Sequence, residues 1–394
     1  MIHVATLPDL AHVSVALSRR AAVNEAFFMD NASRVARLCA AMADRFVAGG
    51  RLVALGWSPA AHSDVRHVAV EFVHPVIVGK RALPAIGVSD NAGKSLITRD
   101  DIVLAFGDAE SPARDAIAAA IELAQRRGAL TVAFDAFGAD VELRPGSDDP
   151  FIRQECVETV YHVLWELVHV FFEHEGRGSS AHPGQSAFLY PFLTDAPRDR
   201  APVIDDVARS ALMKARDVSA LRARTLDESA SLELMAAAAA VRDRVESGST
   251  VLTFGNGGSA TDAMDLAADL LEPPVALGLS PRRALDLTVD SAILTALTND
   301  VGSDLVFARQ VAVYAGPDDV AIAFTTSGNS RNIIAALEAA RRRGLLTIAF
   351  TGYEGGRIGA EKLADHVINA PSEYVPRIQE AHATSYHLLR TLIG

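Results

Sequence analysis

The sequence predicts an α/β protein with two tandem domains, each a mostly parallel sheet lying between layers of helices. Three observations lead to this prediction. Short apolar strands alternate with helical runs, which is typical of parallel α/β sheets. The same series of motifs occurs twice along the chain. The 394 residues, of which 49% are hydrophobic and 22% charged, are enough for two globular domains.

An internal duplication is indicated by four sequence blocks that recur in the same order. In both halves, a strand with a polar turn and helix comes first, two further strands follow, and a helix with glutamine and histidine eight residues apart comes last. The paired blocks are residues 51–72 and 249–270, 100–106 and 318–324, 126–134 and 342–350, and Gln154 with His162 and Gln379 with His387.

Each half opens with a long amphipathic helical stretch, and its strands are apolar runs such as LVAL, TVAF, VLTF, AIAF and TIAF. Residues 111–127 and 331–343 predict helices, and residues 160–172 predict a largely buried helix. The stretch between the halves is rich in Gly, Ser and Pro, which is typical of a linker. We therefore expect one domain over residues 1–175, a linker over 176–204 and a second domain over 205–394.

Charge and composition exclude several classes of function. The net charge of −12 opposes binding to nucleic acids or acidic membranes. With two cysteines in the whole chain, a disulfide framework is not expected, and a reducing compartment is. The first residues lack the pattern of a signal peptide, and no apolar stretch is long enough to span a membrane. We expect a cytoplasmic protein.

Two polar turns in the second half each follow a strand and precede a helix. GNGGS spans residues 255–259, and TTSGNS spans 325–330. Backbone N–H groups at such turns, together with a helix N-terminus, attract phosphate. Ligands of parallel sheets bind beyond the carboxyl ends of the strands. The sequence therefore predicts a site for a phosphate monoester, built from Asn256, Gly257, Gly258, Ser259, Thr325, Thr326, Ser327, Asn329 and Ser330.

With GNGGSATDAM and TTSGNS, the second half resembles the sugar isomerase (SIS) domain, and within it the phosphoheptose isomerases. ALTND (296–300), FARQV (307–311) and RIQEAHATSYH (377–387) also match. The resemblance covers about residues 205–394 and, more loosely, 17–174. It implies tandem SIS domains with a three-layer, flavodoxin-like fold and no nucleotide cofactor. It also implies an aldose–ketose isomerase that converts sedoheptulose 7-phosphate to glycero-manno-heptose 7-phosphate through an enediol. Further substrate-binding residues implied by it are Asn299, Asp300 and Gln379.

The family is expected to carry histidine and glutamate four residues apart on one helix, and glutamine and histidine eight apart on the last, with zinc in some members. The first half keeps this set, whereas the second half has two aspartates in place of the first pair. The first-half set, which is also the possible zinc site, is His67, Glu71, Gln154 and His162; the second-half set is Asp265, Asp269, Gln379 and His387.

The first half has in turn lost the phosphate-binding turns, since GWSPAAHSD and FGDAESPARD replace them and Asp108 and Glu110 would repel phosphate. We therefore predict a composite site in which the second half binds phosphate and Glu71 and His162 carry the acid/base chemistry. A self-contained site using Asp269 and His387, a non-catalytic sugar-phosphate-binding protein and an isomerase of another sugar phosphate remain alternatives. His67 and Glu71 could also be an ordinary helical pair. A homodimer would give four SIS domains.

Overall fold

A computed structural model describes residues 10–77, 80–89, 93–174 and 200–394, and these form two compact units. We call residues 23–146 and 156–217 the N-terminal unit. The C-terminal unit comprises residues 10–22, 147–155 and 218–394. We describe each unit by itself.

These units differ from the predicted domains because three segments group with the opposite half. The long helices α1 (Leu10–Val47) and α6 (Arg200–Thr225) each contribute residues to both units, and α4 (Pro150–His174) does so too. The reason is that the apolar face of α1 continues along the helix: Val13 is buried in the core of the C-terminal unit and Phe28 in that of the N-terminal unit. Most of the predicted linker, 175–199, lies outside the described residues, and α6 already begins at Arg200.

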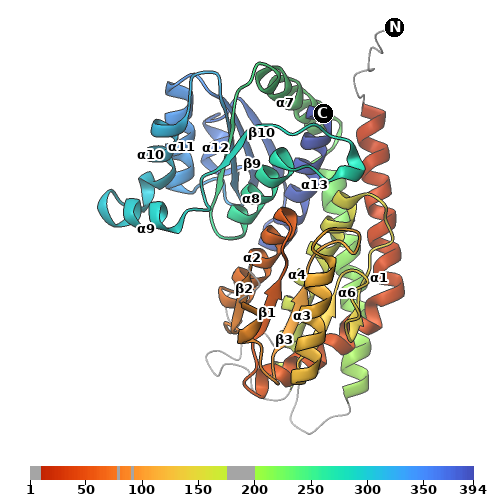
Figure 1. Ribbon diagram of the computed structural model, residues 1–394. Coiled ribbons are helices and arrows are strands. Elements are labelled where there is room, and N and C mark those ends of the chain that lie inside the picture. The colour runs from red at the N-terminus through yellow and green to blue at the C-terminus, as the bar shows by residue number, and fades with distance from the viewer. Residues whose placement is uncertain (1–9, 78–79, 90–92, 175–199) are drawn as a thin grey trace. The chain divides into compact units, whose positions relative to one another are not determined.

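The N-terminal unit holds a five-stranded, all-parallel sheet of order β2-β1-β3-β4-β5 (Figure 1). In β1, Leu52 and Ala54 point to one core with α1, α2 and α4, while Val53 and Leu55 point to the opposite core beneath α3. The elements are β1 (Leu52–Leu55), α2 (Pro59–Val73), β2 (Ala85–Val88), η1 (Gly93–Leu96), β3 (Ile102–Ala105), α3 (Arg114–Arg127), β4 (Leu130–Ala133) and β5 (Val141–Glu142).

The C-terminal unit has a second parallel sheet, of order β10-β9-β8-β6-β7. In β8, Ile322 and Phe324 pack with α7, α8 and α13, and Ala321 and Ala323 pack with α10 and α11 on the other face. The elements are α7 (Glu228–Glu246), β6 (Val251–Gly255), α8 (Gly258–Leu271), η2 (Val275–Leu277), β7 (Ala284–Asp286), α9 (Ser291–Asp300), η3 (Ser303–Leu305), α10 (Val306–Tyr314), β8 (Val320–Thr325), α11 (Arg331–Arg342), β9 (Leu346–Gly352), α12 (Gly356–Ala360), β10 (His366–Ala370) and α13 (Val375–Ile393).

The two sheets share one topology, because β1 to β5 correspond in order to β6 to β10. This confirms the predicted fold class of two three-layer parallel α/β domains. The units differ in the segment that contains ALTND. In the C-terminal unit α9, η3 and α10 lie between β7 and β8. Between the corresponding strands of the N-terminal unit, β2 and β3, η1 is the one helical element among the described residues. Within the described part of the chain, no helix is both long and apolar enough to cross a membrane.

Candidate functional site

The two polar turns of the C-terminal unit lie side by side. Strands β6 and β8 are neighbours in register, with Gly255 opposite Phe324, so the turns that follow them share the carboxyl edge of the sheet. The side-chain amides of Asn256 and Asn332 bond reciprocally across this edge, at 3.0 and 2.9 Å. Turns 70 residues apart in sequence therefore form one surface.

The first turn brings the start of α8 close to the strand. A Cβ atom on Gly255 would lie 2.1 Å from the carbonyl oxygen of Ser259, so only glycine fits there. Gly257, the N-cap, has a φ of +58° and provides no side-chain cap. The first N–H groups of a helix have no partner within the helix. In this turn Ser259 N and Ala260 N donate to Asn256 O and Gly257 O at 3.0 Å. An anion here would be attracted by the helix dipole and by the N–H groups that precede these two.

The second turn presents hydroxyl groups at the start of α11. The hydroxyls of Thr325 and Ser330 lie 3.3 Å apart, and the Ser330 side chain does not cap the helix. Thr326, Ser327 and Ser330 are half-buried and Asn329 is exposed. The Ser327 hydroxyl accepts from Asn329 N at 3.2 Å, which leaves its own proton for a phosphate oxygen, and the Ser330 hydroxyl can donate in the same way. The structure thus places the predicted phosphate-binding residues of both turns on one edge.

Asn299 and Asp300 are not brought to these turns. They lie on α9, which has no buried residue and packs on η3 and α10. The Asn299 amide donates to Asp300 at 2.7 Å. Their predicted role in substrate binding therefore has no support in the geometry of this unit.

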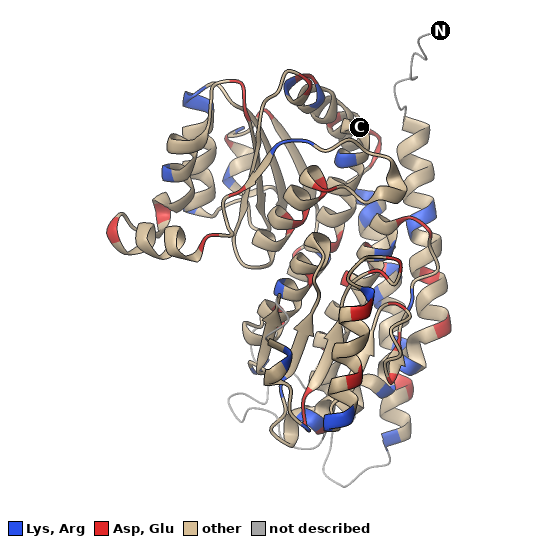
Figure 2. Ribbon diagram, in the orientation of Figure 1, with Lys and Arg blue, Asp and Glu red and all other residues tan. Residues whose placement is uncertain are grey.

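The second-half acid/base residues form a fully buried cluster on α8 and α13. Figure 2 shows acidic residues along α8, and two of them, Asp265 and Asp269, face His387. The Nε2 atom of His387 lies 3.4 Å from Asp265 Oδ2 and 3.5 Å from Asp269 Oδ2. Its Nδ1 atom lies 3.0 Å from Glu155 Oε1, and the ring of Phe151 stacks on it at 4.3 Å. His387 is therefore surrounded by three carboxyl groups.

Glu155 connects this cluster to two arginines. Arg20 Nε donates to both Glu155 oxygens at 2.9 and 3.0 Å, and Arg222 lies at 3.8 Å. The hydroxyl of Thr384 donates to Glu155 Oε2 at 2.5 Å. Burial opposes ionisation of Glu155, but Arg20 and His387 outweigh burial and hold its pKa well below its usual range. Glu155 is thus a buried carboxylate with its hydrogen bonds satisfied.

The same contacts fix the proton on His387. Burial alone would lower the pKa of His387, but hydrogen bonds with Asp265 and Glu155 raise it to about 10. Burial and the charge of Asp265 raise the pKa of Asp269 well above its ordinary value. At neutral pH the histidine is therefore a cation and is not available as a base, and the raised pKa of Asp269 favours the protonated form of that carboxyl group.

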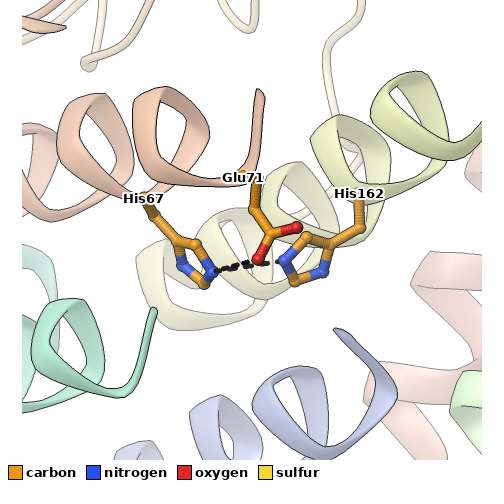
Figure 3. Close-up of side chains that lie close together, drawn as sticks. All are labelled: His67, Glu71 and His162. Carbon is orange, nitrogen blue, oxygen red and sulfur yellow. Dashed lines mark hydrogen bonds and ion pairs between the residues drawn. The ribbon is translucent and has the colours of Figure 1, made fainter. Parts of the chain in front are cut away.

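The first-half residues His67, Glu71 and His162 converge in the N-terminal unit. His67 and Glu71 lie on α2 and His162 on α4, and their side chains point toward one another (Figure 3). The two Nε2 atoms are 3.3 Å apart, and His67 Nε2 is 4.0 Å from Glu71 Oε1. All three side chains are buried, with exposed fractions of 3% for His67, 3% for Glu71 and 0% for His162. Tyr161 fixes the far side of His67, with its hydroxyl 3.0 Å from Nδ1.

This arrangement suits acid/base chemistry. A hydrogen bond between two Nε2 atoms requires that one of them carries no proton, so the imidazoles share a proton beside a carboxylate. It also suits a metal ion, because the ligand atoms of all three residues lie within 4.8 Å of one another. For zinc at 2.0–2.1 Å from its ligands, a tetrahedral edge is roughly 3.3 Å, and two histidines with a glutamate are a known catalytic set.

The two glutamines lie elsewhere. Gln154, predicted as a fourth ligand of this set, belongs to the C-terminal unit, where its amide donates to Asp265 Oδ1 at 2.8 Å. Gln379, predicted to bind substrate, is buried on α13, and its Oε1 has no hydrogen-bond partner among the described residues. The structure thus brings together three of the four predicted metal ligands.

In the N-terminal unit, the protein's own side chains occupy the turns that correspond to the phosphate site. The hydroxyl of Ser58 accepts from Ala61 N and caps α2. In the next turn, Ala109 N donates to Asp135 at 2.9 Å and Glu110 N to Asp108 at 2.8 Å. Carboxylates therefore take N–H groups that a phosphate would need, in agreement with the loss predicted from Asp108.

Sequence reasoning missed Glu155, Arg20 and Phe151 as partners of the second-half cluster. One signal was present, because the dipeptide Gln-Glu recurs at 154–155 and 379–380. This repeated dipeptide points to Glu155 as a residue of the cluster, because it adjoins the repeated glutamine. No sequence signal connects Arg20 to Glu155, because the two are 135 residues apart.

Comparisons with known proteins show what the chain is similar to. Residues 215–352 match the family model of the SIS domain. The phosphoheptose isomerase of Solidesulfovibrio magneticus is 44% identical over 177 residues, which are 45% of this chain and 84% of that protein. The phosphoheptose isomerase of Aquifex aeolicus is 43% identical over 161 residues, 41% of this chain and 83% of that protein.

A solved structure extends the similarity of fold over both halves. The C-terminal domain of glucosamine-fructose-6-phosphate aminotransferase from Francisella tularensis covers 96% of this chain and 93% of its own, with a TM-score of 0.59 and 10% identity. At this identity the likeness concerns the fold alone. The sequence relatives decide the family, since their identity extends over more than four fifths of their length. The chain belongs to the phosphoheptose isomerase family of SIS-domain proteins.

Proposed function

We propose that the protein is an aldose–ketose isomerase that converts sedoheptulose 7-phosphate to glycero-manno-heptose 7-phosphate. The observation that carries this proposal is the pair of adjacent turns at two helix starts, whose N-cap residues Gly257 and Ser330 make no side-chain cap and whose hydroxyls can donate to phosphate oxygens, which suits a phosphate monoester. The relatives named phosphoheptose isomerase support the reaction and the substrate.

The two units have different roles in this reaction. The turns around Ser259, Ser327 and Ser330 hold the phosphate, and Glu71 with His162 carries out the proton transfers. Two observations support this division. The pKa of the second-half histidine is raised to about 10, which favours the cation, and the pKa of Asp269 beside it is raised as well. The corresponding first-half turns are occupied by Asp108 and Asp135.

In this mechanism, Glu71 removes the proton from C1 of the ketose while the carbonyl oxygen at C2 receives a proton from the imidazole pair. The resulting enediol then loses the proton of its C1 hydroxyl to the imidazole, and protonated Glu71 returns a proton to C2. All atoms of the ketose are retained in the aldose, and the proton shared by His67 and His162 is restored.

A divalent metal fits the same three residues. His67, Glu71 and His162 would hold it through two imidazole nitrogens and one carboxylate oxygen, the ligands that Zn²⁺ accepts. When bound, Zn²⁺ would polarise the oxygens on the two reacting carbons. Tyr161 beside Nδ1 would orient the ring of His67, as outer groups do for metal-bound histidines.

The test is turnover in deuterium oxide. Incubating the full chain with sedoheptulose 7-phosphate should give the aldose phosphate, with deuterium entering at C2 as the carboxyl group exchanges its proton with solvent. Measurable binding of the sugar phosphate without formation of any aldose phosphate would contradict isomerisation and indicate a sugar-phosphate-binding protein.

A further inference from the structure

A second feature beside the phosphate turns is a pocket of about 590 Å³ in the C-terminal unit. Ser327 and Asn329 of the second turn form one wall. The loop after β9, at Tyr353, Glu354 and Gly356, and the loop after β10, at residues 371–373, form the others. The pocket is therefore continuous with the hydroxyl turn to which the phosphate is assigned.

The pocket walls are fixed to that turn. A Cβ atom on Gly328 would lie 2.1 Å from the carbonyl oxygen of Gly355, and one on Gly356 would lie 2.4 Å from that of Ser327. Arg357 N donates to Asn329 Oδ1 at 3.0 Å. Because these backbones touch and only glycine fits between them, a ligand on the turn has the pocket beside it at a constant position.

Tyr353 is held at this pocket in an unusual conformation. Its φ is +53°, in the left-handed region that residues other than glycine rarely adopt because the side chain crowds the backbone there. Its backbone is bonded on both sides, because Tyr353 N donates to Ser372 O at 3.0 Å and Asn369 Nδ2 donates to Tyr353 O at 3.1 Å. The side chain remains 38% exposed. Such strained residues concentrate at ligand sites.

The charges of the pocket favour a neutral, hydroxyl-rich ligand. Glu354 and Glu373 are exposed, and among the described residues neither has an ion pair or side-chain hydrogen bond. No lysine or arginine lines the pocket. Carboxylates repel a phosphate but accept hydrogen bonds from hydroxyls, and they do so strongly because they are charged. An exposed tyrosine ring supplies an apolar face for C–H groups.

We propose that this pocket is the subsite for the polyhydroxyl chain of the sugar phosphate, and that Tyr353, Glu354 and Glu373 determine which sugar is accepted. The tyrosine ring packs against the carbon chain, and the two carboxylates accept hydrogen bonds from its hydroxyls. The identity of the ligand rests on the proposed function, whereas the subsite itself requires only that a sugar phosphate binds to the turns.

The experiment is calorimetric titration of the full chain with inorganic phosphate, glycerol 3-phosphate and sedoheptulose 7-phosphate. Wild type should bind the heptulose phosphate most tightly, because its hydroxyls reach the pocket. Glu373→Gln keeps the shape of the side chain but removes its charge. It should weaken heptulose phosphate binding about tenfold, the loss of one charged hydrogen bond, and leave the affinity for inorganic phosphate unchanged.

Tyr353→Asn is the second variant, since asparagine tolerates positive φ better than other residues and the loop keeps its shape. It should also reduce the preference for the heptulose phosphate over inorganic phosphate. Glu338→Gln, an exposed carboxylate on α11 paired with Arg342, is the matched control and should change nothing.

Equal affinity of wild type for all three ligands, or an unchanged preference in both Tyr353→Asn and Glu373→Gln, would overturn the subsite. A normal preference without turnover would contradict the isomerase proposal and leave the subsite standing. The failures of the two proposals are thus distinguishable.

Discussion

Glu155 has a structural role that its position in the sequence does not reveal. It is buried among Arg20, Arg222 and His387, and the removal of its charge takes from these three cations the carboxylate that they share. Breaking one side of a buried ion pair costs about 3–5 kcal/mol. Glu155→Gln should therefore lower the free energy of unfolding by about that amount, as measured by urea denaturation.

The control for Glu155→Gln is the exposed pair of Arg342 and Glu338, whose oxygen and nitrogen lie 3.7 Å apart. Exposed pairs contribute about 0–1 kcal/mol. Glu338→Gln should therefore hardly change stability. A similar loss in the two variants would show that Glu155 is not the centre of a buried charge network.

The protonation of His387 predicts a pH dependence of stability. Its folded pKa, about 10, is above the ordinary value of 6.5, so the folded state binds the proton more tightly. The stabilisation is complete below about pH 6.5 and is lost as pH rises toward 10. Wild type should lose on the order of a few kcal/mol of unfolding free energy between pH 7 and pH 9.5.

His387→Gln removes this titrating group, so the decline between pH 7 and pH 9.5 should be smaller in the variant. Urea denaturation at both pH values measures the two slopes. If the variant and wild type declined equally, His387 would not be held as a cation.

Several residues of the site could be predicted from the sequence, and others could not. The turns follow apolar strands, and His67 with Glu71 shares a helix face, so short spacings place them. Glu155 and Arg20 are 135 residues apart and meet only through packing. The role of Tyr353 depends on a backbone angle, which no residue type in that stretch indicates.

At the scale of elements, the strands were predictable because each one is a continuous apolar run between polar turns. The predicted runs 52–55 and 251–254 correspond to β1 (Leu52–Leu55) and β6 (Val251–Gly255). The helix predicted over 331–343 is α11 (Arg331–Arg342). Helix starts were predicted less accurately, because the helix predicted over 111–127 begins at Arg114 in α3 (Arg114–Arg127). Serine and proline there are equally suited to a turn.

The polar turns make a prediction about individual hydroxyls. Ser330 does not cap α11 and is accessible, so its hydroxyl can bond to phosphate. Ser330→Ala should weaken binding of sedoheptulose 7-phosphate by about 1–3 kcal/mol, the loss of a hydrogen bond to a charged group. Isothermal titration measures the change.

The matched change in the other repeat is Ser111→Ala. Ser111 lies in the turn whose N–H groups are taken by Asp108 and Asp135. This variant should bind the sugar phosphate as wild type does. Equal weakening in both variants would mean that each repeat has its own phosphate site.

At the scale of the whole molecule, the duplication could be read from the sequence, but the boundaries of its units could not. The linker composition predicts a boundary at residue 205, whereas the C-terminal unit also contains residues 10–22 and 147–155. A fragment of residues 205–394 would lack Arg20, Gln154 and Glu155. For this reason the division of work is best tested in the full chain. The expected homodimer stays a prediction.

The central claim is that Glu71, rather than Asp269, removes the proton from carbon. Both positions can be changed with little steric disturbance. Glu71→Gln preserves the size of the side chain, and Asp269→Asn puts a neutral amide of the same size in place of a carboxyl group whose pKa is raised. Both variants should therefore fold and bind sugar phosphate nearly as wild type does.

The most direct measurement is the turnover number of these two variants with sedoheptulose 7-phosphate, determined alongside the dissociation constant. Our account predicts that Glu71→Gln lowers kcat by orders of magnitude with little change in binding, the effect of losing an interaction made in the transition state. Asp269→Asn should keep most of the activity. The opposite result, with Asp269→Asn inactive and Glu71→Gln nearly as active as wild type, would place the catalytic base in the C-terminal unit and contradict the proposed division of work.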